Sequence, residues 1–255
     1  YFELFYYAHL YGAQVLIISV LFHASNGWYY ILPGLLLQFI ERIYRIWNCT
    51  QIVRLINLEK VSTVITRVEI AVPHKYSFAS GKWSSMNDHP CVKLGHYCFL
   101  NIPNISPFEW HPFSVSNALN HPSTVFYVKN MHRGWTQKLN KIAEKTWCID
   151  KLNIAVEGPY GITLDFANYQ HIVLVAGGVG ITPFHNIFFS LYQEVLAHGG
   201  DSMNNGNNIT STIELWWINR RADAFSYYID SFRQFQNEPV EFMKIKLYAT
   251  RERLR

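Results

Sequence analysis

The chain has 255 residues, enough for about two domains at ~100–200 residues each. Hydrophobic residues make up 49% of it and aromatic residues 16%, which is high for a purely soluble protein, yet the mean hydropathy is close to zero, so an apolar part must be balanced by a polar part. The formal charge of +4 is weak and scattered, which argues against nucleic acid as a partner.

The cysteines indicate the redox compartment of the protein, and the start of the sequence indicates that it is part of a longer chain. Cys49, Cys91, Cys98 and Cys148 form no C-x-x-C pair, which favours free thiols in a reducing compartment. The sequence starts at Tyr1 without an initiator Met or a signal peptide, so we interpret it as an internal fragment.

Two apolar runs, Leu4–Ala24 and Trp28–Trp47, open the chain on either side of an Asn26-Gly27 turn signal. Each is about 20 residues long, the length that crosses ~30 Å of hydrocarbon. The sequence therefore predicts a transmembrane helical hairpin in residues 1–50. A pair of long core helices in a soluble protein is the alternative.

The orientation of this hairpin follows from three arginines, Arg42, Arg45 and Arg54, at and after the end of the second run. Basic residues mark the cytoplasmic end of a membrane helix. We expect an integral membrane protein in contact with lipid, in the plasma membrane, with the rest of the chain in the cytosol.

Two histidines, His9 and His23, lie fourteen residues apart in the first run. At 3.6 residues per turn they share one helix face and are separated by about 21 Å along the axis. Ionisable residues inside a membrane are costly and often functional. We predict that each is one axial ligand of a haem b, with the second ligands of both haems outside this chain. The alternative is that they are polar residues facing neighbouring helices.

After the apolar runs, the residue pattern changes twice. Residues 56–166 contain short β-rich stretches separated by turn residues, which predicts an antiparallel β-barrel, with a helix near Trp135–Lys145. Residues 168–255 alternate apolar strands with helix-like runs, which predicts the incomplete start of a doubly wound α/β domain. Its elements are His171–Ala176, Thr182–Ala197, Ile213–Ile218, Ala222–Phe235 and Met243–Ala249. The predicted fold is therefore multi-domain.

Four motifs carry a family resemblance: His111–Ser116, Gly134-Trp135-Thr136, Glu157–Gly161 and Gly177–Phe184. In this order and spacing they resemble the NADPH oxidase and ferric reductase family, membrane flavocytochromes with ferredoxin-reductase-like domains. The opening run Phe2–His9 also resembles that family's fifth transmembrane helix. The resemblance covers nearly the whole chain.

The resemblance implies an FAD site in the barrel. The segment along the flavin would be His111, Pro112, Phe113 and Ser114. The turn that binds the FAD pyrophosphate would be Gly134, Trp135 and Thr136, where N–H groups at a helix N-terminus favour an anion. The positive charge for this pyrophosphate would come from Lys129, His132 or Arg133, and the spacing leaves open which one.

The resemblance also implies an NADPH site. In the nucleotide loop, Gly177, Gly178 and Gly180 would let the backbone approach a pyrophosphate, and Thr182 and Pro183 would open the following helix. Gly158 and Gly161 resemble a segment that approaches the same crevice. Arg220 and Arg221 follow a strand where a ribose 2′-phosphate would be bound, which favours NADPH over NADH; a solvated basic turn is the alternative.

The implied function is transmembrane electron transfer. NADPH would reduce FAD, and electrons would pass through the haems of His9 and His23 to a small-molecule acceptor outside, either ferric chelate or oxygen. Accessory regulatory subunits are further possible partners. No residue is predicted to act as a general base, and the other histidines (His74, His89, His96, His121 and His185) are interpreted as surface or loop residues without zinc spacing.

Two other readings remain open. One is a ferredoxin-reductase-like flavoprotein without haem, soluble or membrane-associated. The other is a non-catalytic membrane scaffold with a decayed reductase domain.

Overall fold

A computed structural model gives the fold of most of the chain. It describes residues 2–71, 76–77, 82–83, 95–116, 123–131, 133–144, 152–162, 164, 166, 169–197, 204–205, 208–209, 212–220 and 222–251. The chain divides into two compact units, Tyr1–Cys49 and Thr50–Arg255.

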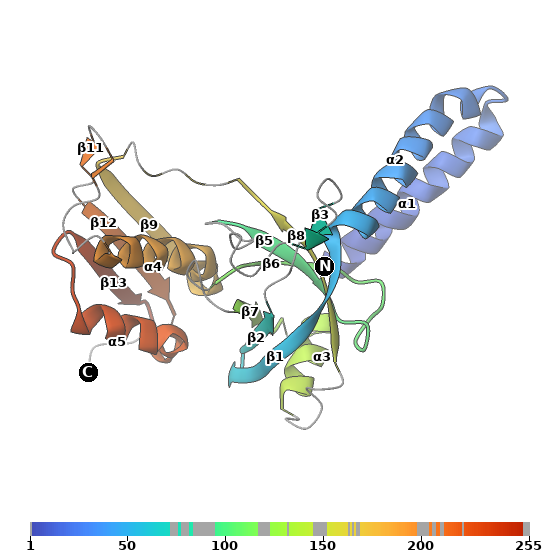
Figure 1. Cartoon of the computed structure of the whole chain (residues 1–255). Helices are drawn as coiled ribbons and strands as arrows, with labels where there is room; N and C mark the ends of the chain where they lie inside the picture. The colour runs from blue at the N-terminus through green and yellow to red at the C-terminus, as the bar shows by residue number, and fades with distance from the viewer. Residues whose placement is uncertain are drawn as a thin grey trace. The chain divides into compact units, whose positions relative to one another are not determined.

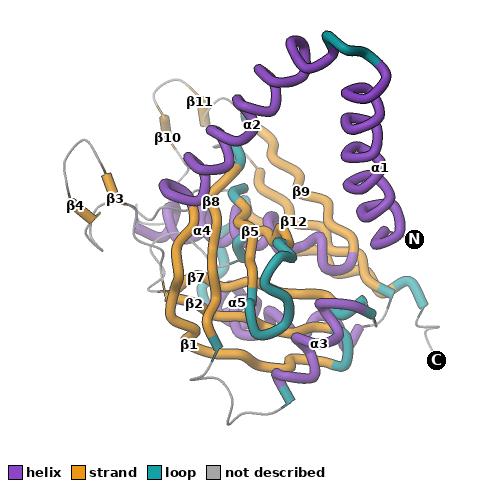
Figure 2. The backbone as a smooth tube through the Cα atoms, turned by 90° about the vertical axis from the view of Figure 1, so that its right-hand side faces the viewer, coloured by secondary structure: helices purple, strands orange, loops and turns teal. Residues whose placement is uncertain are grey.

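The first unit is a hairpin of two helices, α1 (Phe2–His23) and α2 (Gly27–Cys49), which are joined by a short turn (Figure 1) and diverge away from it (Figure 2). Gly27 begins α2, and a Cβ at this position would stand 3.2 Å from Val20 O, so the tight turn needs glycine. The helices coincide with the two predicted apolar runs. Within the described part of the chain, no helix has both the length and the apolar character needed to span a membrane.

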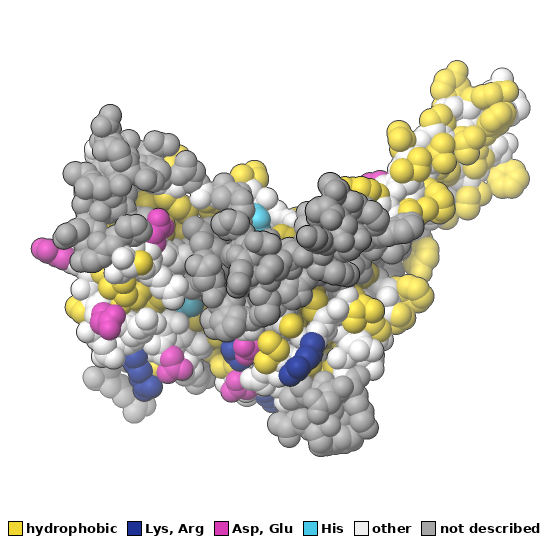
Figure 3. Space-filling view, in the orientation of Figure 1, with side chains coloured by type: hydrophobic (Ala, Val, Ile, Leu, Met, Phe, Trp, Pro, Cys, Tyr) yellow, Lys and Arg dark blue, Asp and Glu magenta, His cyan; other side chains and the backbone are white. Residues whose placement is uncertain are grey.

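The surface of this hairpin is nevertheless rich in large apolar side chains, which cover much of the face visible in Figure 3. Phe22 is 89% exposed and Tyr30 is 86% exposed. His9 and His23 are also exposed; the His9 ring stacks on Phe5 with a centroid separation of 5.3 Å. Nothing in this unit therefore buries the two predicted haem ligands.

The second unit begins with a six-stranded antiparallel sheet in the order β6-β5-β8-β1-β2-β7. Its strands are β1 (Thr50–Ser62), β2 (Ile65–Ala71), β5 (Tyr97–Asn101), β6 (His111–Ser114), β7 (Ser123–Lys129) and β8 (Asn153–Tyr160). The two edge strands meet, because the Ser116 N–H just after β6 donates to Val125 O of β7 at 3.0 Å. The sheet thus closes into the predicted barrel.

Alternating side chains fill the barrel. Val68 and Ile70 of β2 and Phe126 of β7 have no exposed surface, whereas Tyr127 and Lys129 point outward. Helix α3 (Gly134–Ala143) adds Trp135 and Leu139 to the same core. Cys98 also lies in this core.

The rest of the second unit is an α/β domain whose three strands are all parallel, in the order β13-β12-β9. Its elements are β9 (His171–Gly177), η2 (Gly178–Gly180), α4 (Ile181–Ala197), β12 (Thr212–Asn219), η3 (Ala222–Tyr228), α5 (Ile229–Asn237) and β13 (Met243–Ala249). Helices α4 and α5 share one core with these strands (Figure 1). The parallel sheet confirms the predicted nucleotide-binding fold.

Two details of this domain differ from the sequence prediction. The run predicted as a helix over Ala222–Phe235 is a 3₁₀ segment, η3, followed by α5. The continuous apolar run predicted as a strand, β9, alternates in burial: Val173 and Val175 are about half exposed, while Ile172 and Leu174 are buried. An apolar run alone cannot distinguish a strand covered on one face from one covered on both.

Two short strand pairs complete the described elements. They are β3 (Tyr76–Ser77) with β4 (Lys82–Trp83), and β10 (Asn204–Asn205) with β11 (Asn208–Ile209).

Candidate functional site

The glycine loop lies between β9 and α4 and leaves its backbone open. Gly178 has φ +55°, a left-handed conformation that favours glycine. A Cβ added to Gly177, Gly178 or Gly180 would meet no heavy atom within 4 Å among the described residues. These glycines are therefore not required by packing, and their surface is free for the close approach of a pyrophosphate to backbone N–H groups.

A buried tryptophan that sequence reasoning did not single out holds this loop. Trp217 of β12 has no exposed surface, and its Nε1–H donates to Gly178 O at 2.9 Å. Thr182 in the first turn of α4 donates through Oγ1 to Val179 O at 3.3 Å, and Pro183 follows it in that turn. The Trp216-Trp217 pair in a strand was the only sequence signal, and it does not indicate a hydrogen bond to a loop 39 residues away.

The carboxyl edge of the parallel sheet brings the loop near an arginine. Ile218 of β12 pairs with Gly177 of β9, and Arg220 follows two residues later as an exposed side chain. The backbone there is fixed: Arg220 N–H donates to Asn219 Oδ1 at 2.8 Å, and Arg251 N–H donates to Arg220 O at 3.0 Å. Arg221, the other predicted phosphate ligand, lies outside the described residues.

Strand β6 carries the predicted flavin segment, and its alternate side chains meet a tryptophan. The rings of His111 and Phe113 lie 4.6 and 5.9 Å from that of Trp135, measured between centroids. Pro112 and Ser114 alternate with them along the strand. The structure thus brings together three of the residues predicted to contact FAD from two separate motifs.

The start of α3 has the backbone of an anion-binding turn. Gly134 has φ +61°, and Arg133 before it is extended and makes no side-chain cap. Thr136 Oγ1 accepts from Met131 N–H at 3.0 Å and donates to Arg133 O at 3.4 Å, so it fixes the turn without capping the first amides. Lys129 is exposed at the end of β7, while His132 lies outside the described residues.

Gly158 and Gly161 have a packing reason for being glycine. Gly158, which precedes a cis peptide bond to Pro159, has φ +136°, and Gly161 has φ +123°. A Cβ would stand 3.3 Å from Cys98 Sγ at Gly158 and 3.2 Å from Gly95 O at Gly161. Their role at the nucleotide crevice therefore stays a prediction.

The two residues after β6 form a buried group with residues of α4 and η3, which we call the Ser116 cluster: Val115, Ser116, His185, Asn186 and Tyr228. His185 Nδ1–H donates to Ser116 O at 2.9 Å, and Asn186 Nδ2–H donates to Val115 O at 3.4 Å. The hydroxyls of Ser116 and Tyr228 are also hydrogen-bonded. The sequence interpretation of His185 as a surface or loop residue is wrong, because only 6% of it is exposed.

The electrostatics of the Ser116 cluster keep it uncharged. Burial lowers the pKa of His185 to about 3, partly offset by its bond to the Ser116 carbonyl, so the imidazole is neutral at pH 7. Its ring stacks on Tyr228 at 3.8 Å, and its Nε2 has no partner among the described residues. Burial also raises the pKa of Tyr228 well above its usual range.

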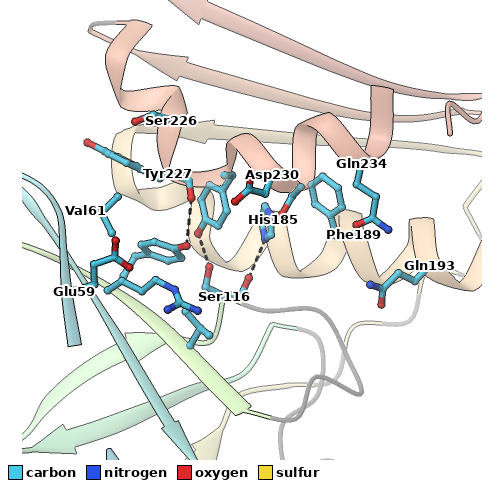
Figure 4. Close-up of a pocket in the computed structure, with 15 residues that line it drawn as sticks. Glu59, Val61, Ser116, His185, Phe189, Gln193, Ser226, Tyr227, Asp230 and Gln234 are labelled. Atoms are coloured by element: carbon cyan, nitrogen blue, oxygen red, sulfur yellow. Dashed lines mark hydrogen bonds between the residues drawn. The ribbon is translucent and has the colours of Figure 1, made fainter. Parts of the chain in front are cut away.

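An open cavity of about 670 Å³ lies beside the Ser116 cluster (Figure 4). It is lined by barrel residues such as Glu59 and Tyr127, and by Gln193, Ser226 and Asp230 from α4, η3 and α5. Ser116, His185 and Tyr228 of the cluster also line the cavity, whereas none of the residues predicted to bind FAD or NADPH does so.

The residues present fit both cofactors. Trp135 Nε1 is buried without a partner among the described residues, and an indole N–H can only donate, so it suits an oxygen of a bound FAD. The open space over the glycine loop suits the pyrophosphate of a nicotinamide nucleotide. For haem, the predicted axial ligands are His9 and His23, and the described residues contain no group of three or more metal-ligating side chains.

Comparison with known proteins agrees with this arrangement. Residues 53–164 match an FAD-binding domain family, and residues 169–255 match the ferric reductase NAD binding domain family. In structure, the chain is similar to a ferredoxin NADP+ reductase from Neisseria gonorrhoeae with bound FAD and NADP (TM-score 0.57, 15% identity, 81% of this chain and 70% of that one). Phthalate dioxygenase reductase is also similar (TM-score 0.52, 19% identity, 80% and 53%). These two likenesses establish the ferredoxin-reductase-like fold.

Curated relatives identify the family. Ferric reduction oxidase 8, mitochondrial, of Arabidopsis thaliana is 36% identical over an alignment of length 199 that covers 74% of this chain and 25% of that protein. A superoxide-generating NADPH oxidase heavy chain of Dictyostelium discoideum is 26% identical over an alignment of length 262 that covers 93% of this chain and 35% of that protein. The chain thus spans a quarter to about a third of these relatives. It belongs to the ferric reductase and NADPH oxidase family and carries that family's FAD-binding and NAD-binding domains.

Proposed function

We propose that the protein containing this chain transfers electrons from cytosolic NADPH through FAD and two haems to an acceptor on the other side of a membrane. The main support is the juxtaposition of the flavin strand β6 and the glycine loop through the Ser116 cluster, in a chain of this family. FAD, when bound, supplies the conversion between two-electron hydride chemistry and one-electron transfer.

In this proposal the chain itself binds, orients and shields the cofactors. His111, Phe113 and Trp135 form one wall of the flavin site, and the uncapped amides of α3 bind its pyrophosphate. The glycine loop binds the nucleotide pyrophosphate, and Arg220 pairs with the 2′-phosphate. No side chain needs to act as an acid or a base.

The helical hairpin is proposed to lie in the membrane and to supply one axial ligand to each haem. The support is the apolar surface of α1 and α2 and the spacing of His9 and His23 on one helix. Both imidazoles are exposed in this unit and are free to coordinate. The second ligands would come from helices outside this chain, and the flavin and nucleotide domains would lie in the cytosol of a plasma-membrane protein, with any regulatory subunits as further partners.

Ferric chelate is the first proposed acceptor, because the ferric reduction oxidase relative is the more similar in sequence, at 36% identity against 26%. Oxygen, giving superoxide, is the second, because the similarity to the NADPH oxidase relative extends over 93% of the chain and includes the hairpin region.

The test uses the full-length protein in membranes. NADPH is added without oxygen and the haem absorbance is followed; oxygen or a ferric chelate is then admitted and the rate of haem reoxidation is compared. His9→Leu and His23→Leu should each remove one haem, whereas the exposed-surface control Gln14→Leu should keep both. A protein that purifies with flavin but no haem would support the haem-free flavoprotein instead, and one without either cofactor would support the scaffold.

A further inference from the structure

The Ser116 cluster connects the two cofactor motifs over a very short length of chain. On one side, Val115 and Ser116 follow directly after the flavin strand β6, which ends at Ser114. On the other, His185 and Asn186 lie in the first two turns of α4, which begins right after Gly180. Five residues of helix rise about 7.5 Å, so any shift at His185 is passed to the glycine loop within one and a half turns.

The hydrogen bonds of the cluster are directional and shielded from water. The backbone carbonyls of Val115 and Ser116 accept from two consecutive side chains of α4, and the Ser116 hydroxyl bonds that of Tyr228 in η3. Asn186 and Ser116 are 1% exposed and Tyr228 is 4% exposed. Buried polar groups that lose a partner are costly, so these bonds hold one arrangement rather than several.

The tautomer of His185 is fixed by the same contacts. A carbonyl oxygen can only accept, so Nδ1 carries the proton that bonds Ser116 O. The His185 ring stacks on Tyr228 and also contacts Phe189, with 4.5 Å between the centroids of the His185 and Phe189 rings. The His185 side chain therefore cannot rotate to another partner without losing these ring contacts.

We infer that His185, Asn186 and Tyr228 are positioning residues for hydride transfer: they hold the glycine loop at a fixed distance from the flavin strand. His185 and Asn186 act through the carbonyls of residues 116 and 115, and Tyr228 acts through the Ser116 hydroxyl. This inference rests on the proposed function. Hydride transfer depends steeply on the donor–acceptor distance, and a misplacement of about 1 Å can cost on the order of a hundredfold in rate.

Paired variants separate positioning from simple stability. His185→Leu removes the donor, whereas His185→Asn keeps an N–H near the position of Nδ1. Asn186→Leu removes the second donor, and Tyr228→Phe removes one hydroxyl while keeping the stacked ring. Tyr248→Phe makes the same chemical change at a half-exposed ring of β13 and serves as the control.

The kinetic readout is the rate of flavin reduction by NADPH in the full-length holoprotein, measured anaerobically by stopped flow. Both leucine variants should slow this step about tenfold or more, with the FAD content, the KM for NADPH and the rate of dithionite reduction within about twofold of the parent. His185→Asn should recover most of the rate, and Tyr248→Phe all of it. Unchanged rates in both leucine variants would overturn the inference.

The second readout does not depend on activity. Amide hydrogen exchange of the nucleotide-free protein should accelerate in residues 111–116 and 177–187 of the leucine variants, with β2 unchanged. Equal acceleration in β2 would mean that the cluster only stabilises the fold and would overturn the inference. If the parent binds NADPH but reduces no flavin, the proposed function fails, while the exchange pattern still decides whether the cluster couples the two motifs.

Discussion

Replacing Gly178 by alanine should separate the conformational and the binding roles of the glycine loop. At φ +55° a Cβ costs roughly 1–2 kcal/mol in backbone strain, but it would meet no described atom within 4 Å. We therefore expect the free energy of unfolding to fall by about 1 kcal/mol and the fold to persist. Gly180→Ala is the matched variant: its surroundings are equally open and its φ is not left-handed, so its stability should be unchanged or slightly higher.

Nucleotide affinity, unlike stability, should fall in both variants. Both alanines add a methyl group where the backbone would contact the pyrophosphate, so both should weaken NADP+ binding by about tenfold or more, roughly 1.4 kcal/mol. Denaturant unfolding gives the stability and isothermal titration of the flavin-loaded protein gives the affinity, with the exposed Gln236→Ala of α5 as control. Unchanged affinity in both glycine variants would refute the assignment of the loop to the nucleotide.

Three further changes test other contacts. Trp217→Phe should cost about 1 kcal/mol or more for the lost bond to Gly178 O and raise the KM for NADPH, which thermal unfolding and steady-state kinetics measure. Arg220→Gln should raise the KM for NADPH but not for NADH; equal effects on both would reject a 2′-phosphate contact. Because burial lowers the pKa of His185, the unfolded state binds one more proton than the folded state below about pH 6.5. The free energy of unfolding should therefore fall toward pH 3 by at most about 1.4 kcal/mol per pH unit. His185→Asn should flatten this slope, which urea unfolding at a series of pH values measures.

Local patterns were sufficient for much of the fold. The apolar runs became α1 and α2, the β-rich stretches became a barrel, and the glycine loop lies between a strand and a helix as its sequence indicated. Each of these depends on residues that are neighbours in sequence, where periodicity and turn chemistry decide. The turn at Gly134 is also local, and the left-handed φ of this residue fits the glycine there.

Contacts between distant segments could not be predicted in this way. His185 bonds a carbonyl 69 residues earlier in the chain, and nothing in its own neighbourhood distinguishes it from a solvated histidine. A side chain at position 158 or 161 would crowd Cys98 or Gly95, a reason for glycine that the motif itself did not indicate. Such residues become visible only when the strands and helices have been packed together.

Strand β1 has a consequence for how the barrel is made in the cell. From Leu55 onward β1 pairs with β2, which is synthesised directly after it. Residues 50–54 of β1 instead pair with β8, which is synthesised about a hundred residues later. At about 5–20 residues per second, the first part of β1 waits roughly 5–20 seconds during translation with an unpaired edge. Barrel closure is therefore a late, long-range event, and the nascent chain is most exposed to misassociation before Tyr160 has left the ribosome.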